Sequence, residues 1–303
     1  MNTHSNPSGT YKNLPALAGL GSFAQAMRPG LSVEECVTRL KRFHYLLKRL
    51  HQIFNNRLTA EPIYELKMGF SLHAHYCAEH VSALRKRVSE MREPPLGLDE
   101  LPHPALEIFC DEILAAPSTQ ELLLGLYEEA LPSLQAGLRK HMADTNLLAD
   151  HPSIRVCRFA LLEIEEMIAF GKGCLRGLLP ETDRARHQGW VQRLRSCLRA
   201  AGGLDGSAAS GSASAAASTP ATPGEVPARR YSAEPIRYDP VPRRDERFAD
   251  PYNMGVNAEV FLYDPSAPPE PKTLMMFYKR LREIDVPEMM ASIIAETPGR
   301  PWD

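Results

Sequence analysis

The sequence lacks the short motifs that mark the commonest catalytic and nucleotide-binding folds. It contains no glycine-rich phosphate loop, no Gly-x-Ser-x-Gly elbow and no His-Glu-x-x-His helix. It also contains no Cys-x-x-Cys pair, which excludes the usual spacings of zinc ribbons and thioredoxin-like redox sites. Any chemistry must therefore come from residues that lie apart in the sequence and meet in the fold.

A long apolar run and a strong net charge are also missing. No run approaches the roughly 18 to 20 apolar residues that span a bilayer, and the start of the chain lacks the basic and apolar regions of a secretory signal. The formal net charge of −2 gives no global field toward nucleic acid or a membrane surface. We therefore expect a cytoplasmic protein with neither partner, whose six scattered cysteines are reduced core residues.

Composition and apolar spacing divide the chain into four regions. We expect a flexible N-terminal arm over 1–30 and a helical bundle over 31–200. A disordered Ala/Ser/Gly/Pro linker over 201–229 follows, and then an extended segment plus a C-terminal helix over 230–303. The predicted fold class is all-α, an antiparallel helical bundle with a flexible linker and a wrapping segment that ends in a helix.

Local signals place several helix boundaries. Ser32 and Glu35 have the spacing of a capping box, in which the hydroxyl caps a backbone N–H and the carboxylate reaches back. Ser118 and Glu121 repeat that spacing before a second apolar run. Pro132 lies inside this run, where it removes a backbone donor, and so it predicts a kink or an interruption.

The helix predicted over 61–91 places metal-capable side chains on its apolar face. His73, Cys77 and His80 follow one another at spacings of four and three, in a stripe that a bundle helix normally fills with leucine. One interpretation is a metal site, in which a thiolate beside imidazole favours zinc or copper over iron. The other is that the histidines are hydrogen-bonded core residues and Cys77 is a small apolar filler.

Three further residues could complete such a site. His44 lies near the apolar stripe of the first long helix, and Glu163 and Glu166 lie one turn apart on a helix that is otherwise apolar. The alternatives are that His44 flanks the helix seam and touches solvent, and that the two glutamates pair with basic residues at the bundle edge. The candidate metal ligands are thus His73, His80, Glu163, Glu166, Cys77 and His44.

Long helices, inward histidines and paired glutamates resemble the ferritin-like superfamily. The run YNMGVNAEVFLYD at 252–264 and the run that follows at 272–303 are similar to a group of uncharacterised bacterial ferritin-like proteins. The resemblance implies iron-dependent oxygen chemistry, with Glu283 or Glu288 matching the lone carboxylate of a first bundle helix and a following helix carrying Glu-x-x-His. The sequence departs from that pattern at Cys77, which stands where the family has an acidic residue.

Two classes of function are compatible with the sequence. The first is a non-haem metal-dependent oxidoreductase of unknown substrate, with iron or manganese as the metal, or zinc if Cys77 is a ligand. The second has no metal, and the bundle acts as an interaction or scaffold protein. In that case the amphipathic helix within 271–296 would contact a second copy of the chain or another protein.

Overall fold

We describe a computed structural model of the chain over residues 11–92, 96–209, 226–247, 263–270, 272–273 and 285–297. Most of the predicted 201–229 linker and of the 271–284 stretch lies outside these ranges.

The predicted all-α fold is confirmed, since every regular element within the described ranges is a helix. The helices are α1 (Phe23–Ala26), α2 (Val33–Ala60), α3 (Tyr64–Met91), α4 (Pro104–Leu114), α5 (Thr119–Leu123), a π-helical segment (Leu124–Ala130), α6 (Leu131–Asp144), α7 (His151–Leu178), α8 (Gln188–Ala200) and α11 (Asp285–Glu296). Short 3₁₀ turns join some of them.

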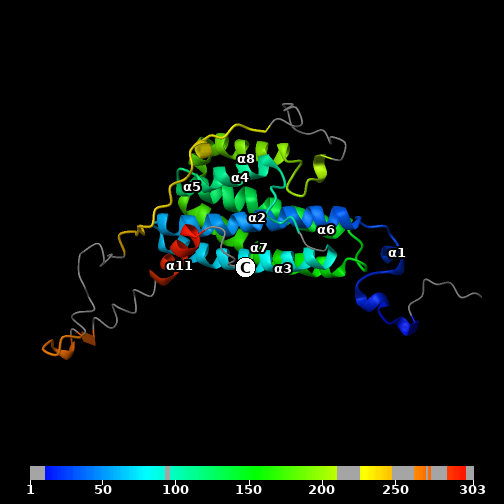
Figure 1. Ribbon diagram of the computed structural model, residues 1–303, viewed down its shortest axis with the longest axis horizontal. Coiled ribbons are helices and arrows are strands. Elements are labelled where there is room, and N and C mark those ends of the chain that lie inside the picture. Colours follow the sequence, from blue (N-terminus) through cyan, green and yellow to red (C-terminus); the bar gives the residue numbers. More distant parts are fainter. Residues whose placement is uncertain are drawn as a thin grey trace, which may run out of the picture.

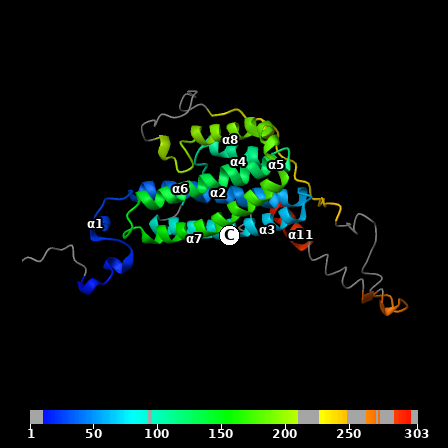
Figure 2. The same ribbon diagram turned by 180° about the vertical axis from the view of Figure 1, so that it is seen from behind.

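Four long helices form the main bundle. α2 packs along α3 and α6 packs along α7, while α3 also contacts α7 and α2 contacts α6, which closes the group. Two of the connections are short, so each of these pairs is antiparallel. Figure 1 shows the four helices side by side, with α4, α5 and α8 above them, and Figure 2 shows the same layers from behind.

Both ends of α2 follow from the sequence. The predicted capping box is present: Oγ of Ser32 accepts a hydrogen bond from the backbone of Glu35, and the Glu35 carboxylate accepts one from the backbone of Ser32. At the other end Glu61 is extended, and Pro62 lies in the short turn that precedes α3, which begins at Tyr64. The tight turn brings α3 back along α2.

The interruption predicted at Pro132 takes the form of a π-helical segment. α5 passes directly into the π-helical residues Leu124–Ala130, and α6 starts at Leu131 with the proline in its first turn. Proline has no N–H to donate, so a change of helical register just before it is the expected response. This segment carries Tyr127 and Glu129 into the bundle, where both are buried.

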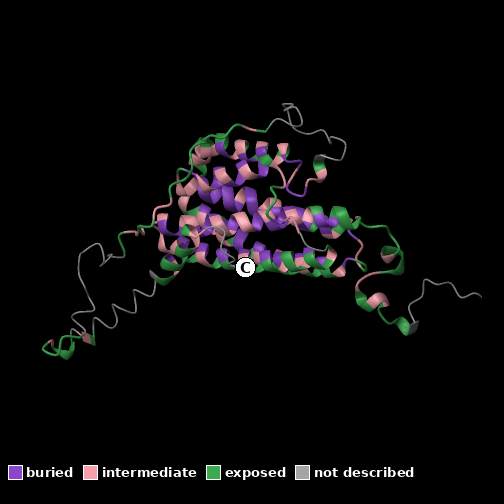
Figure 3. Ribbon diagram, in the orientation of Figure 1, coloured by how far each residue is buried: buried purple, intermediate pink, exposed green. Residues whose placement is uncertain are grey.

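The core lies between the two layers. Figure 3 shows the buried residues concentrated where the four long helices meet one another and the α4–α5–α8 layer. Its largest side chains are aromatic, and those that are almost fully enclosed are Phe43, Phe54, Phe70, Phe109, Tyr127 and Trp190. The stripe predicted on the 61–91 helix is buried from Leu66 to Val88, with Met91 only half-buried at its end.

The segment 226–247 wraps over the bundle and is held first by Glu112 of α4. This fully buried carboxylate accepts hydrogen bonds from the backbone N–H groups of Arg230, Tyr231 and Ser232, and from Oγ of Ser232. Burial alone would raise the pKa of Glu112, but these donors outweigh burial and lower the pKa. Tyr231 also packs against the indole of Trp190, at 5.4 Å between ring centroids.

α11 returns to the turn between α2 and α3. The buried carboxylate of Glu288 pairs with Lys67 of α3 at 2.6 Å and with Arg244 of the wrapping segment at 2.5 Å. Lys67 also donates to the backbone carbonyl groups of Leu58 and Thr59, at the end of α2. The wrapping segment 226–247 and α11 are therefore fixed to the bundle through two buried glutamates, Glu112 and Glu288.

Among the described helices, none has a stretch long and apolar enough to cross a bilayer. The six cysteines are all free thiols, and only Cys174 is not fully buried.

Candidate functional site

Five of the six predicted ligands lie on α3 and α7 and the sixth, His44, lies on α2, and the six do not converge on one point. Nε2 of His80 lies 2.7 Å from a carboxylate oxygen of Glu163, so these two residues do meet. Burial lowers the pKa of His80, and Glu163 opposes that shift. Within the described residues no third predicted ligand joins them to form a set of three whose ligand atoms lie within 4.8 Å of one another.

The other four predicted residues have separate surroundings. Cys77 is fully enclosed, and burial strongly raises the pKa of its thiol. His44 is buried on α2, so the prediction that it could touch solvent is wrong. Glu166 is exposed on α7. His73 shares a 2.8 Å hydrogen bond through Nδ1 with the hydroxyl of Tyr127.

His73 and Tyr127 form a neutral buried pair. Burial lowers the pKa of His73 to about 4 and raises that of Tyr127, so neither side chain is charged near neutral pH. Gly171 of α7 lets Tyr127 approach, because a Cβ atom at that position would lie 2.0 Å from Cγ of the ring. Phe54 and Phe170 pack edge-on against the imidazole, at 5.5 and 5.2 Å between ring centroids.

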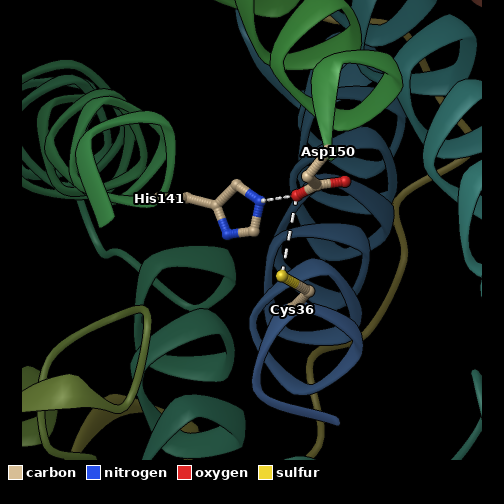
Figure 4. Close-up of side chains that lie close together, drawn as sticks. All are labelled: Cys36, His141 and Asp150. Carbon is tan, nitrogen blue, oxygen red and sulfur yellow. Dashed lines mark hydrogen bonds and ion pairs between the residues drawn. The ribbon is translucent and has the colours of Figure 1, made fainter. Parts of the chain in front are cut away.

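A different set of residues converges at the opposite end of α3. Cys36 lies in the first turn of α2, His141 in the last turn of α6, and Asp150 is the residue that precedes α7. Their sulfur, nitrogen and oxygen ligand atoms all lie within 4.8 Å of one another, and all three residues are buried. Figure 4 shows the three side chains pointing toward one another from these three helix ends.

The two oxygens of Asp150 have different roles. Oδ1 accepts hydrogen bonds from Arg87 at 2.9 Å and from Ser153 at 2.5 Å. Oδ2 faces the centre of the group: it lies 3.6 Å from Sγ of Cys36 and 3.5 Å from Nε2 of His141, and it accepts a bond from Thr145. The carboxylate is therefore oriented from outside and presents one oxygen inward.

These donors control the charge of the group. Burial alone would raise the pKa of Asp150, but the nearby imidazole of His141 and the hydrogen bonds from Ser153, Thr145 and Arg87 hold it well below its usual range. Burial raises the pKa of Cys36, and its thiol donates to Asp150. A carboxylate therefore lies beside a protonated thiol and an imidazole.

Of the three residues, His141 is the one whose side chain has no hydrogen bond within the described part of the chain. Its side chain is fully enclosed, and neither ring nitrogen makes a hydrogen bond to any described residue. Nε2 approaches a carboxylate oxygen of Asp150 at 3.5 Å. Buried polar groups normally have a partner, and leaving one without costs about 1 to 3 kcal/mol. The imidazole is thus aimed at a centre where a further atom could bind it.

The spacing of the three ligand atoms suits a small metal ion. In a tetrahedral zinc site, bond lengths of about 2.0 to 2.3 Å place neighbouring ligand atoms roughly 3.3 to 3.8 Å apart. The two separations from Asp150, 3.5 Å to nitrogen and 3.6 Å to sulfur, lie in that range. This buried group could therefore hold a metal, and its ligands come from three helices.

The sequence carried one overlooked sign of this group. Leu134, Leu138 and His141 occupy one stripe of α6 at spacings of four and three, and all three are buried. A histidine at the end of an apolar stripe is the same signal that selected His73 and His80 on α3. Its partners could not be found by spacing, because Cys36 lies more than a hundred residues earlier in the chain.

Comparison with known proteins does not assign the chain to a family: no family model, no curated protein and no solved structure matches it.

Proposed function

We propose that this protein is a zinc-binding helical bundle in which Cys36, His141 and Asp150 are the protein ligands. The observation that carries the proposal is the buried imidazole of His141, which has no described hydrogen-bond partner and points at a cysteine and a carboxylate. A bound metal ion would satisfy this nitrogen directly. It would also convert the thiol of Cys36 to a thiolate, with release of its proton.

The type of ligand favours zinc over the iron or manganese that the ferritin-like resemblance implies. Hard ions of iron and manganese select sites rich in carboxylates, whereas thiolate and imidazole are typical zinc ligands. Only Asp150 in this group offers oxygen from a carboxylate, and its outer oxygen is already bound to Arg87 and Ser153. Such outer hydrogen bonds orient the ligand in known zinc sites.

Burial favours a structural role for the metal over a catalytic one. The three ligand residues are at most 7% exposed, so a substrate has no route to an open coordination position. The ligands tie the start of α2, the end of α6 and the start of α7. Bound zinc would therefore add a direct link between three helix ends that otherwise meet through loops, packing and a few hydrogen bonds and ion pairs.

Cobalt is the sharpest probe of this site, because a cobalt–thiolate bond produces an intense charge-transfer absorption band. We expect the metal-free protein to develop this band on titration with one equivalent of Co²⁺ and to lose it when Zn²⁺ is added. Cys36→Ser should abolish the band, while Cys174→Ser, at the half-buried cysteine of α7, should retain it. No thiolate band in the unaltered protein, or an equal band in the Cys36→Ser variant, contradicts the proposal.

Iron-dependent oxygen chemistry would require a different metal site in the bundle. The His80–Glu163 pair joins α3 to α7 and supplies two ligands of the kind that iron binds. No third His, Cys, Asp or Glu among the described residues brings a ligand atom within 4.8 Å of both. Zinc binding at the Cys36 group is therefore the better supported proposal.

A second candidate function, protein association through α11, has an observation of its own. Val286, Met289, Met290 and Ile293 form a stripe at spacings of three, one and three, and they are 41 to 55% exposed. The other side of α11 is fixed to the bundle by Glu288 and Ala291, so this stripe faces away from it. A surface helix that is fixed on one side and apolar on the other suits contact with a second copy of the chain.

We expect the protein to form a dimer that dissociates in the double variant Met289→Glu/Ile293→Glu. Light scattering coupled to gel filtration measures the mass directly, and Phe159→Glu, which changes an exposed apolar residue of α7, is the matched control. A monomer at every accessible concentration of the unaltered protein would exclude self-association through α11.

A further inference from the structure

A groove between α3 and α7 lies apart from the Cys36 group. Its volume is about 640 Å³, which is in the range of sites for drug-sized molecules. Met68, Leu72 and Tyr76 of α3 form one wall and Phe170 of α7 the other. Met68 and Leu72 are each 48% exposed, so the groove presents large apolar side chains to solvent.

The groove owes its depth to a glycine. A Cβ atom at Gly69 would lie 2.4 Å from Cζ of Phe170, so any other residue would displace the aromatic ring. The lining residues of α3 run from Tyr64 to Tyr76, which corresponds to about 18 Å along the helix axis. The site is therefore elongated, and it suits a molecule with an extended apolar body.

Polar groups are unequally placed along this length. Contacts between α3 and α7 pair His80 with Glu163 and Gly69 with Phe170, so the helices are antiparallel and Glu166 lies between the levels of His73 and Cys77. The end near Glu65 is different, because both oxygens of that carboxylate are bound by Arg247, at 2.6 and 2.7 Å. Glu166, which has no basic residue among the groove-lining side chains, thus marks one end of the groove. Glu65, whose carboxylate is neutralised by Arg247, marks the other.

His73 provides the floor at the Glu166 end. Nδ1 is committed to Tyr127, which leaves Nε2 as the ring nitrogen available to a ligand. Because burial lowers the pKa of His73 to about 4, the imidazole stays neutral at physiological pH and does not repel a cation. Tyr76 and Phe170 add aromatic faces that attract cations.

We infer that this groove binds an organic ammonium ion with an elongated apolar body. The charged head lies beside Glu166 and His73, and the body extends along Leu72, Met68 and Phe170. The inference concerns different residues from the zinc proposal, so either can fail without the other.

Three ligands with the same ten-carbon chain but different head-group charge separate the contribution of charge from that of the apolar body. They are decylammonium, decanol and decanoate, each titrated into the full chain by calorimetry below its aggregation concentration. We expect decylammonium to bind most tightly and decanoate least. Glu166→Gln should weaken decylammonium binding by about two- to fivefold, the range of an exposed ion pair, and leave decanol binding unchanged. Equal affinity for decylammonium and decanoate would overturn the charge assignment.

A matched pair of variants locates the site. Leu72→Lys places a like charge in the wall and should weaken decylammonium binding by about tenfold or more. Leu162→Lys makes the same change at an exposed leucine of α7 outside the groove, and it should leave the affinity unchanged. Both leucines are exposed, so neither variant threatens folding. No binding by the unaltered chain, or equal losses in the two variants, would overturn the inference.

Discussion

Replacing Asp150 by alanine is expected to lower the free energy of unfolding by about 3 to 5 kcal/mol, the range for removing one partner of a buried charge pair. Arg87, whose side chain is 12% exposed, would lose its buried acceptor. The hydroxyl groups of Ser153 and Thr145 would lose theirs as well. Urea denaturation in the presence of a chelator measures the effect without any contribution from metal.

Asp144 supplies the matched control. It also pairs with basic side chains, Arg39 and Lys140, but its side chain is 29% exposed. Because these pairs are partly open to solvent, Asp144→Ala should cost less than Asp150→Ala, about 1 kcal/mol. Equal losses at the two positions would show that the buried network around Asp150 has no special part in stability.

The protein is also expected to lose stability on acidification because of His73. The pKa of its imidazole is about 4 in the folded chain, against an ordinary value of 6.5. Between these values the unfolded chain binds more protons than the folded one, so the free energy of unfolding falls as the pH falls from 6.5 to 4. A shift of that size corresponds to about 3 kcal/mol at most.

The test compares denaturation curves at pH 7 and pH 4.5. His73→Gln keeps a hydrogen-bonding group beside Tyr127 but cannot titrate, so its loss of stability between the two pH values should be smaller than that of the unaltered chain. His75→Gln, on the exposed side of the same helix, should match the unaltered chain. An identical pH dependence in the His73→Gln variant would contradict a buried neutral imidazole.

Much of the fold was predictable because helix signals are local. The capping residue Ser32, the stripe on α3 and the interruption at Pro132 all depend on neighbours within one or two turns. The wrapping segment was predicted from composition, but its anchors were not. Glu112 and Glu288 are fixed by backbone and basic groups that lie far away in the sequence.

The site was less predictable for the same reason. The stripe identified His73, Cys77 and His80 as buried, yet it could not show that His73 bonds to Tyr127, because a π-helical segment sets the direction of that tyrosine. Helical spacing shows only which residues of one helix share a face. The Cys36 group takes one residue from each of three helix ends, so no spacing rule within a helix could reveal it.

Elemental analysis of protein purified without chelator tests the central claim most directly. The His141→Ala and Cys36→Ser variants are measured beside the unaltered chain, and circular dichroism confirms that each variant is helical. The account predicts about one equivalent of zinc in the unaltered protein and loss of that zinc in both folded variants. A metal-free unaltered protein, or zinc that persists when His141 and Cys36 are each replaced, would contradict it.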